Sequence, residues 1–292
     1  MTPPSFGDRE YWDQRYAGAS DEFEWLLPAS SLDTAVLAAL ESSSSPAPRI
    51  IHLGCGTSSL SFQLRKIVPT PGQVHNVDFS GPCIEAGREK ERALFGTGEG
   101  EGGGDGGEGG GMEWSVLDLL SSEQITRLAG EDGSPRPYEV VVDKSTLDSI
   151  CCGDDVAVPP PSLIRAAAGD VPPDVSSTVP ARSTMYPMDL LAVHLAHLTP
   201  PGAHWIALSY SGMRFDGWWP ADGSDPATRW IRSETNCLPH PSRLWQLKSM
   251  EGIPVKEDHA GENAVAVHRP EILHYLFTLV RTDVSLASGA GD

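Results

Sequence analysis

The sequence predicts an α/β protein with a doubly wound, Rossmann-like sheet of seven strands. Short apolar segments alternate along the chain with segments of helical periodicity, which is typical of parallel strands joined by helices. The uninterrupted apolar run Val140-Val141-Val142 indicates a strand that is buried on both faces of such a sheet. Residues 243–250 and 273–281 are β-like segments without a strong helix between them, so we expect an antiparallel strand pair at one sheet edge.

An apolar periodic segment and a short apolar run predict the first helix and the first strand. Ser30 and Asp33 are three positions apart at the start of segment 30–40, a capping-box pattern that predicts a helix start. The serine- and proline-rich residues 42–48 end this helix. The mostly apolar residues 50–53 then predict a short buried strand.

A glycine turn follows this strand. Gly54 and Gly56 allow a tight bend and a close approach of the backbone to a ligand. We expect Ser58 and Ser59 to cap the next helix, which the periodicity places over residues 60–69.

The remaining elements continue the alternation. Four further segments have the length and apolar content of strands: residues 73–78, 112–118, 138–144 and 204–209. Two segments show helical periodicity: residues 84–95 and 185–198. Five parallel strands and the C-terminal pair make up the seven-strand sheet.

Glycine and proline, 30 and 25 residues in the whole chain, are concentrated in two insertions. Residues 96–111 consist almost entirely of glycine and acidic residues, which predicts a flexible loop. Residues 154–182 contain several prolines and few large apolar side chains, which predicts a second flexible, irregular insertion. With a lid segment at 1–30 and a frayed tail at 285–292, residues 1–292 are expected to form one domain.

The chain carries 21 basic and 40 acidic residues, a formal net charge of −19. This excess argues against a nucleic-acid-binding protein with a basic phosphate-binding face, and against attachment to anionic lipid. It permits a basic protein partner, because opposite charges speed encounter; solubility is the alternative explanation. No run approaches the roughly 20 apolar residues of a membrane span, and the N-terminal residues do not resemble a signal peptide.

The five cysteines form no C-x-x-C pair, which is typical of reduced thiols in a cytosolic protein. We therefore expect a cytoplasmic protein. His194 and His197 lie three positions apart on a predicted helix, and a zinc site could use both, but no third ligand is nearby in the sequence. We expect a packing role for these histidines and predict no metal site.

Acidic residues stand at the expected carboxyl ends of three strands. Asp78, Asp118 and Asp143 end the second, third and fourth strands, and the glycine turn ends the first. Because ligands of doubly wound sheets bind beyond the carboxyl ends of the strands, we expect these groups to meet in one site. Asp78 is placed to hold ribose hydroxyls and Asp118 to accept from an adenine amino group. Phe79 and Leu119 can cover the faces of the adenine ring.

The expected ligand is an adenosyl compound other than a dinucleotide. A dinucleotide fingerprint requires glycine at position 59, where the chain has Ser59. A P-loop requires lysine followed by serine or threonine after its glycines, and the turn has no such pair. The glycine turn together with three strand-end acids favours S-adenosylmethionine. The alternative is that these acids only cap loops.

Four short motifs occur in the order and spacing of a known family. They are YWDQRY at 11–16, FEW at 23–25, LGCGTS at 53–58 and DKSTLD at 143–148. Through them the chain resembles the seven-strand class I methyltransferases, and within these the branch of the elongation factor 1-alpha lysine methyltransferases. The similarity covers residues 11–25, 50–90, 112–150 and, more weakly, 184–215.

The resemblance implies S-adenosylmethionine as the cofactor and S-adenosylhomocysteine as the product. Trp12, Tyr16 and Trp25 would close over the cofactor from the N-terminal segment; without the resemblance they would be expected as core anchors of a first helix. The other implied cofactor-binding residues are Gly54, Cys55, Gly56, Asp78, Phe79, Asp118, Leu119, Asp143 and Lys144.

The chain departs from the family in a few places. Thr57 and Ser145 replace the asparagine and glycine that are usual at these positions, which weakens the match little for cofactor binding. The two insertions and segment 215–230 are not covered by the resemblance, so their role in substrate binding is open. Trp218 and Trp219 could form a mobile substrate lip or a packed loop.

The expected reaction is in-line transfer of a methyl group to a nucleophile. The cofactor carries the activated methyl group, so the protein mainly aligns it with the acceptor. A lysine acceptor must first lose its proton, and entry into a partly dry channel lowers the pKa of its amine. No dedicated base is required. The candidate catalytic residues on the acceptor side are Asp143 and Tyr210, together with the loop 213–219.

Three functions are compatible with the sequence. The first is a protein-lysine methyltransferase that acts on a basic protein such as elongation factor 1-alpha. The second is a methyltransferase of the same fold that acts on a small molecule, for which residues 151–182 or 213–230 would form a closed aromatic lid. The third is a cofactor-binding protein without turnover, which loss of the strand-end acids would have suggested.

Overall fold

The computed structural model describes residues 4–17, 24–96, 110–130, 136–167, 171, 175, 179–219, 230–255 and 271–287. The strands of its main sheet are β1 (Ile50–Leu53), β2 (Val74–Asp78), β3 (Glu113–Val116), β4 (Val140–Lys144), β8 (His204–Ser209), β11 (Trp245–Pro254) and β12 (Leu273–Arg281). All seven predicted strands are therefore present, and three of them begin and end at the predicted residues.

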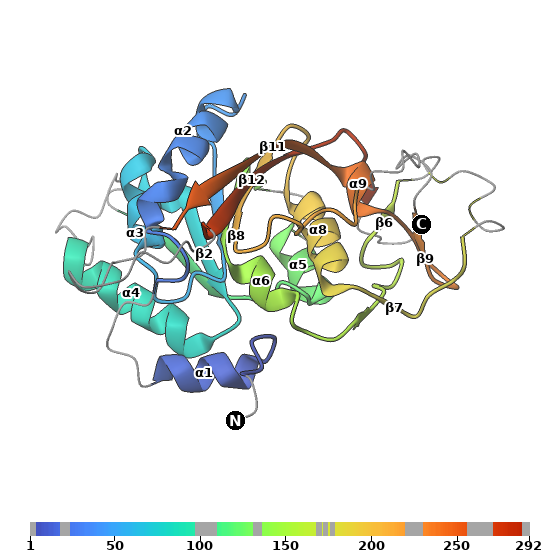
Figure 1. Ribbon diagram of the computed structural model, residues 1–292, viewed down its shortest axis with the longest axis horizontal. Helices are drawn as coiled ribbons and strands as arrows, with labels where there is room; N and C mark the ends of the chain where they lie inside the picture. Colours follow the sequence, from blue (N-terminus) through green and yellow to red (C-terminus); the bar gives the residue numbers. More distant parts are fainter. Residues whose placement is uncertain are drawn as a thin grey trace.

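The strands lie in the order β11-β12-β8-β4-β1-β2-β3, and Figure 1 labels β11, β12, β8 and β2 of this sheet. The five strands from β3 to β8 are parallel, whereas β12 is antiparallel to β8 and β11 is antiparallel to β12. This topology confirms a doubly wound α/β sheet with an antiparallel C-terminal pair at one edge.

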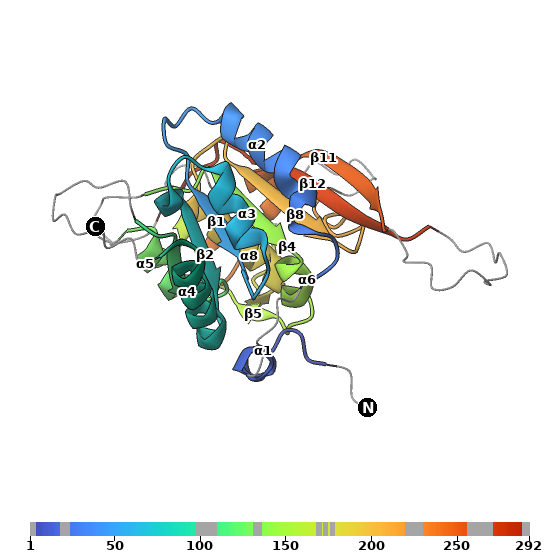
Figure 2. The same cartoon turned by 90° about the vertical axis from the view of Figure 1, so that its left-hand side faces the viewer.

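Helices connect the strands and cover both faces of the sheet (Figures 1 and 2). They are α1 (Arg9–Ala17), α2 (Asp33–Ser42), α3 (Leu60–Ile67), α4 (Gly81–Phe95), α5 (Ser122–Leu128), α6 (Thr146–Ile150), α8 (Pro187–Leu198) and α9 (Pro241–Leu244), with 3-10 turns η1 (Ala29–Leu32) and η2 (Pro71–Gln73). In the described part of the chain, no helix is both long and apolar enough to cross a bilayer.

The central strands β1 and β4 are buried on both faces. Ile51 and Val141 pack into an apolar cluster with residues of α5 and α8, whereas Ile50, Val140 and Val142 pack into a second cluster with residues of α2 and α3. Successive side chains of a strand point to opposite faces, so an uninterrupted apolar run serves both clusters at once.

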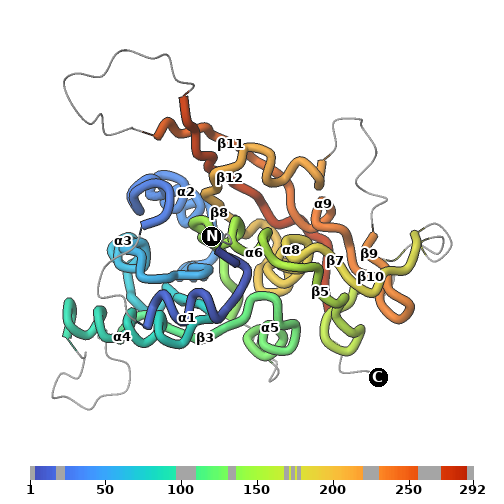
Figure 3. Tube along the Cα trace, turned by 60° about the horizontal axis from the view of Figure 1, so that its bottom comes forward, coloured from blue at the N-terminus to red at the C-terminus, as the bar shows by residue number. Residues whose placement is uncertain are grey.

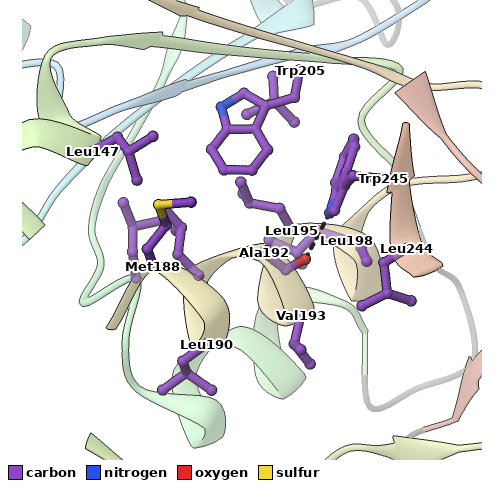
Figure 4. Packing of buried hydrophobic residues seen from close by; sticks show 14 of the residues in the cluster. Leu147, Met188, Leu190, Ala192, Val193, Leu195, Leu198, Trp205, Leu244 and Trp245 are labelled. Carbon is purple, nitrogen blue, oxygen red and sulfur yellow. Dashed lines mark hydrogen bonds between the residues drawn. The ribbon is translucent and has the colours of Figure 1, made fainter. Parts of the chain in front are cut away.

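Helix α8 lies at the centre of one of these apolar layers. Ten of its 12 residues are buried, which identifies it as a core helix rather than a surface one. Trp205 of β8 and Trp245 of β11 pack beside it, with ring centroids 5.4 Å apart (Figure 4). The Trp245 indole N–H donates to the Ala192 carbonyl at 2.9 Å. These contacts fix α8 against the C-terminal half of the sheet.

Helix α2 begins without the capping box that was predicted for it. Ser30 lies in the 3-10 turn η1, and Leu32 precedes α2 with no side-chain cap. The Ser31 amide instead donates to the Pro28 carbonyl at 3.0 Å. A tight turn at the helix start therefore takes the place of the side-chain cap.

The described part of the insertion at 154–182 forms short paired strands. β5 (Val156–Ala157) pairs with β7 (Thr184–Met185), and β6 (Arg165–Ala166) pairs with β13 (Leu286–Ala287). β9 (Trp230–Arg232) and β10 (Cys237–Pro239) form a third pair, and Figure 3 shows β5, β7, β9 and β10 on the same side of α8. Within residues 154–167 and 285–287, which were expected to be irregular, residues 156–157, 165–166 and 286–287 thus form short strands. The glycine-rich residues 97–109 lie outside the described residues.

Candidate active site

A cavity of about 660 Å³ lies at the carboxyl ends of β1, β2 and β4. From β1 the chain proceeds to β2 and β3 on one side, whereas β4 and β8 lie on the other, so the cavity is at the point where the strand order reverses. Helix α1 lies beyond these strand ends, next to α4 (Figures 1 and 2). The predicted site residues that line the cavity are Trp12, Tyr16, Trp25, Gly54, Asp78, Phe79, Asp118, Leu119, Lys144 and Tyr210.

The glycine turn after β1 brings bare backbone to the cavity. Gly54 has a φ of +49°, a left-handed conformation that disfavours other residues. A Cβ atom at Gly54 would lie 2.4 Å from Oγ1 of Thr146, whose hydroxyl donates to the Leu53 carbonyl at 2.9 Å. Glycine is therefore required both by the turn and by the close packing of α6.

Asp78 is held in a fixed position at the end of β2. Its carboxylate accepts hydrogen bonds from the backbone N–H of Gly56 at 3.1 Å and of Ser80 at 2.9 Å. Burial raises the pKa of Asp78 to about 6, although these hydrogen bonds favour the ionised form. Each oxygen keeps a lone pair for a further donor, so the carboxylate can accept hydrogen bonds from ligand hydroxyl groups in the cavity.

The residues after β3 supply a second acid and an apolar wall. Asp118 accepts a hydrogen bond from the Leu120 amide at 2.9 Å, which holds its carboxylate in place. Leu117 and Leu119 are buried and line the cavity together with Phe79. Apolar surfaces beside one carboxylate suit an adenine ring, because its amino group is a hydrogen-bond donor.

Aromatic side chains of the N-terminal segment form another wall. Trp12 stacks on Tyr16 with ring centroids 5.6 Å apart, and its indole N–H donates to the Phe6 carbonyl at 2.8 Å. Trp25 contacts Phe6 edge-on, with ring centroids 5.7 Å apart. Neither Trp12 nor Trp25 belongs to the two apolar clusters of the sheet. These rings therefore cover the cavity rather than anchor the main core.

Glu24 ties this segment to the glycine turn, a role that sequence reasoning missed. Its carboxylate accepts from the Ser59 amide at 2.6 Å and from the Ser58 hydroxyl at 2.9 Å, and it pairs with the Lys144 ammonium at 2.5 Å. Burial raises the pKa of Glu24, but hydrogen bonds from Lys144 and Ser59 outweigh it, so the pKa lies below its usual value. The acid inside the motif at 23–25 was the signal that could have identified it.

Of the two serines after the turn that were expected to cap α3, only one does so. The Ser58 hydroxyl accepts from the Leu60 amide at 3.1 Å, at the start of α3. The Ser59 hydroxyl instead donates to Glu24 at 2.7 Å and does not cap the helix. Only the Ser58 part of the predicted cap is formed.

Similarity to known proteins decides the family. No family model matches the chain. The chain is 35% identical over 215 residues to the methyltransferase srdJ of Neurospora crassa, an alignment that covers 73% of this chain and 70% of that protein. The chain belongs to the class I S-adenosylmethionine-dependent methyltransferases.

Two further relatives are named for the proteins whose lysines they methylate. This methyltransferase is 27% identical over 224 residues to EEF1A lysine methyltransferase 4 of Mus musculus, covering 74% of this chain and 68% of the relative. It is 35% identical over 151 residues to the human mitochondrial citrate synthase-lysine N-methyltransferase, an alignment that covers 50% of this chain and 59% of the relative. A solved methyltransferase from Anabaena variabilis aligns with 95% of this chain and 94% of its own, at 12% identity and a TM-score of 0.48.

Asp143 does not face the cavity of this methyltransferase. Its side chain is fully buried and accepts hydrogen bonds from the backbone N–H of Thr146 at 2.8 Å and of Leu147 at 3.2 Å. It therefore caps the start of α6, and burial raises its pKa to about 7. This position corrects the expectation that Asp143 binds the cofactor or acts on the acceptor side.

Cys55 and Gly56 support the methyltransferase site without lining the cavity. The Cys55 side chain is 1% exposed and lies in an apolar cluster beside Cys83, which corrects its expected contact with the cofactor. Gly56 holds Asp78 through its N–H, and a Cβ atom there would lie 2.8 Å from the Tyr16 hydroxyl. The missing side chain of Gly56 therefore lets α1 approach the turn.

A buried ion pair lies at the end of the cavity beside Tyr210. Tyr210 follows β8, lines the cavity and is 56% exposed. Asp148, a site residue that sequence reasoning did not assign, accepts from Arg214 at 2.6 Å and from the Ser209 hydroxyl at 2.6 Å. The Arg214 guanidinium lies 5.2 Å from the centre of the Tyr210 ring. The Asp148–Arg214 ion pair thus lies next to the Tyr210 ring and supports its position at this end of the cavity.

The loop at 213–219 packs against the core of the methyltransferase. Trp218 is 3% exposed, and its indole N–H donates to Asp189 at 2.8 Å. Its ring contacts Trp205 and Phe215. Of the two interpretations of these tryptophans, the packed loop is the one the structure shows for Trp218.

His194 joins α8 to the cavity wall through packing. Its Nδ1 lies 2.7 Å from the Leu119 carbonyl, and its Nε2 lies 2.9 Å from the Ser122 hydroxyl. Burial lowers the pKa of His194 to about 4, so the ring is neutral and bridges two helical segments. This is the packing role that the sequence predicted.

Proposed function

We propose that this methyltransferase binds S-adenosylmethionine in the cavity and methylates a lysine side chain of a basic protein such as elongation factor 1-alpha. The observation that carries the acceptor class is the similarity to EEF1A lysine methyltransferase 4 over 74% of this chain. The similarity to citrate synthase-lysine N-methyltransferase supports a protein acceptor as well. The net charge of −19 favours encounter with a basic target.

The cavity residues fit the cofactor part by part. Asp78 would accept hydrogen bonds from the ribose hydroxyls, and Asp118 would accept from the adenine amino group beside Phe79 and Leu119. Gly54, whose backbone lines the cavity, would lie beside the methionine part. When bound, the cofactor supplies a methyl group that is already activated on a sulfonium, so the protein has to position rather than activate it.

The acceptor would enter beside Tyr210. This side chain is 56% exposed, so its hydroxyl can hydrogen-bond to an incoming amine. Asp148 is paired with Arg214 and is therefore not a free base. The acceptor amine loses its proton to solvent, and its entry between apolar walls lowers its pKa toward neutrality.

The proposal is tested with radiolabelled S-adenosylmethionine and an extract of cells that lack this methyltransferase. We expect label in a single protein band, and methyl-lysine after acid hydrolysis of that band. Asp78→Ala is the matched control and should reduce the labelling. Label in the small-molecule fraction would contradict the acceptor class. Absence of label despite measurable cofactor binding would contradict turnover itself.

A further inference from the structure

The fold brings together two thiols and a carboxylate that are separate in the sequence. Cys55 lies in the glycine turn, Asp78 ends β2, and Cys83 lies in the first turn of α4. One ligand atom from each lies within 4.8 Å of the other two, and all three residues are buried. Among the described residues, this is the one group of three side chains so arranged.

The spacing of these atoms resembles that of a tetrahedral metal site. A Zn–S bond of about 2.3 Å places two thiolate ligands roughly 3.8 Å apart. The Cys55 and Cys83 sulfur atoms are already 4.0 Å apart. Asp78 accepts one backbone hydrogen bond on each oxygen, so both oxygens retain lone pairs for a cation. Little movement would therefore be needed to complete three ligands.

The group is connected to the outside through the cavity. Asp78 lines the cavity, so a cation can approach along the same path as the cofactor. Tyr16 covers the group from α1. The Tyr16 hydroxyl lies against Gly56, which follows Cys55 and holds the carboxylate of Asp78 through its N–H; a Cβ atom at Gly56 would be 2.8 Å from that hydroxyl.

We propose that Cys55, Asp78 and Cys83 bind a thiophilic divalent cation such as Zn²⁺, and that the bound cation excludes the cofactor. Two metal–sulfur bonds form, and the two thiol protons are released to solvent. Exclusion follows because the cation occupies the carboxylate that, in the proposed function, holds the ribose. This site was not predictable from the sequence, because the two cysteines are 28 positions apart and lack a C-x-x-C spacing.

Binding is tested first with Cd²⁺ on the reduced, full-length protein, through the ultraviolet thiolate-to-metal charge-transfer band. We expect the band to saturate at one equivalent. Cys83→Ser keeps a donor for the Gly56 carbonyl, to which Cys83 donates at 3.1 Å, but removes one soft ligand. It should weaken Cd²⁺ binding at least about tenfold. Cys152→Ser, which changes an exposed thiol on the cavity wall, should leave the band unchanged.

The opposite pattern would overturn the site: a band that survives in Cys83→Ser, or one that disappears in Cys152→Ser. Exclusion is tested separately by calorimetric titration with S-adenosylhomocysteine. One equivalent of Zn²⁺ should raise its Kd at least about tenfold in the wild type and leave it unchanged in Cys83→Ser. Unchanged affinity in the wild type would refute exclusion. If S-adenosylhomocysteine fails to bind without zinc, the proposed function fails, while the Cd²⁺ band still decides the metal site.

Discussion

The carboxylate of Asp78 is preorganised, because backbone N–H groups hold both of its oxygens before any ligand arrives. Asp78→Ala should therefore weaken cofactor binding by roughly 1–3 kcal/mol, as expected for a charge-assisted hydrogen-bond site. The measurement is calorimetric titration with S-adenosylhomocysteine. Glu41→Ala on α2 removes the same charge from an exposed position and should leave the affinity unchanged. Equal affinities for the two variants would refute the placement of the ribose.

Asp143 makes stability depend on pH. Its pKa rises from 3.8 to about 7 in the folded protein, mainly through burial. The folded state therefore binds its proton more tightly than the unfolded state, and the stabilisation is complete below about pH 4 and is lost as the pH rises toward 7. Asp143→Asn should remove this contribution and make the slope shallower, while the contribution of Asp78, whose pKa burial also raises, stays. Urea unfolding between about pH 4 and about pH 7 measures the free energy of unfolding at each pH. If this free energy changes with pH equally in the variant and the wild type, Asp143 is not the source of the dependence.

At the residue scale, the sequence predicts where a strand ends better than where its last side chains point. Asp78 ends β2, Asp118 follows the neighbouring strand β3, and both line the cavity. Asp143 and Lys144 are neighbours on one strand, so their side chains point in opposite directions, and only Lys144 reaches the cavity. The position of a residue at a strand end predicts where its backbone lies. Which of two neighbouring side chains faces the cavity is decided by the packing of α6.

At the scale of elements, we expect the docking of α1 to depend on Glu24, which ties the N-terminal segment to the glycine turn and to Lys144. Glu24→Gln should lose the ion pair with Lys144 and loosen the N-terminal segment. We expect faster amide hydrogen exchange over residues 9–17 and weaker binding of S-adenosylhomocysteine. Glu10→Gln is a matched control, because Glu10 is an exposed acid of α1 that, in the described part of the chain, hydrogen-bonds to Gln14 of its own helix. Unchanged exchange in Glu24→Gln would refute the tether.

Elements with extensive burial were predictable, and small ones were not. Strands β1 and β4 and helix α8 are buried along their length, so their apolar patterns identify them. Helix α1 buries only Trp12 among its nine residues, so it has almost no apolar stripe to detect. Helix α6 has five residues, and its start depends on the side chain of Asp143. Tertiary contacts, rather than local pattern, define these two helices.

At the scale of the whole molecule, two tryptophans join the C-terminal strands to α8. Trp245 donates a hydrogen bond to Ala192, whereas the indole N–H of Trp205 is buried without a partner in the described structure. The substitutions Trp205→Phe and Trp245→Phe both remove buried ring area, but only Trp245→Phe also breaks a hydrogen bond. Trp245→Phe should therefore be more destabilising by about 1–2 kcal/mol. Urea unfolding compares the two variants, and the reverse order would contradict this account of the core.

The large sheet could be predicted because its strands pair with neighbours of the same apolar character. The two-residue strands β6 and β13 pair across more than 100 positions of the chain, and nothing in their own sequence indicates a partner. For the same reason, neither the tie between Glu24 and Lys144 nor the grouping of Cys55 with Cys83 was visible. Each joins segments that only the completed fold brings together.

The ion pair between Glu24 and Lys144 also sets a time before which the N-terminal segment cannot dock while the chain is being synthesised. These residues are 120 positions apart. At a translation rate of roughly 5–20 residues per second, the N-terminal segment waits about 6–24 s before its docking partner is made. During this time the N-terminal segment lacks this contact. The rings of Trp12 and Trp25 thus belong to the part of the cavity wall that is synthesised first, but the tether of their segment forms only after β4 has been made.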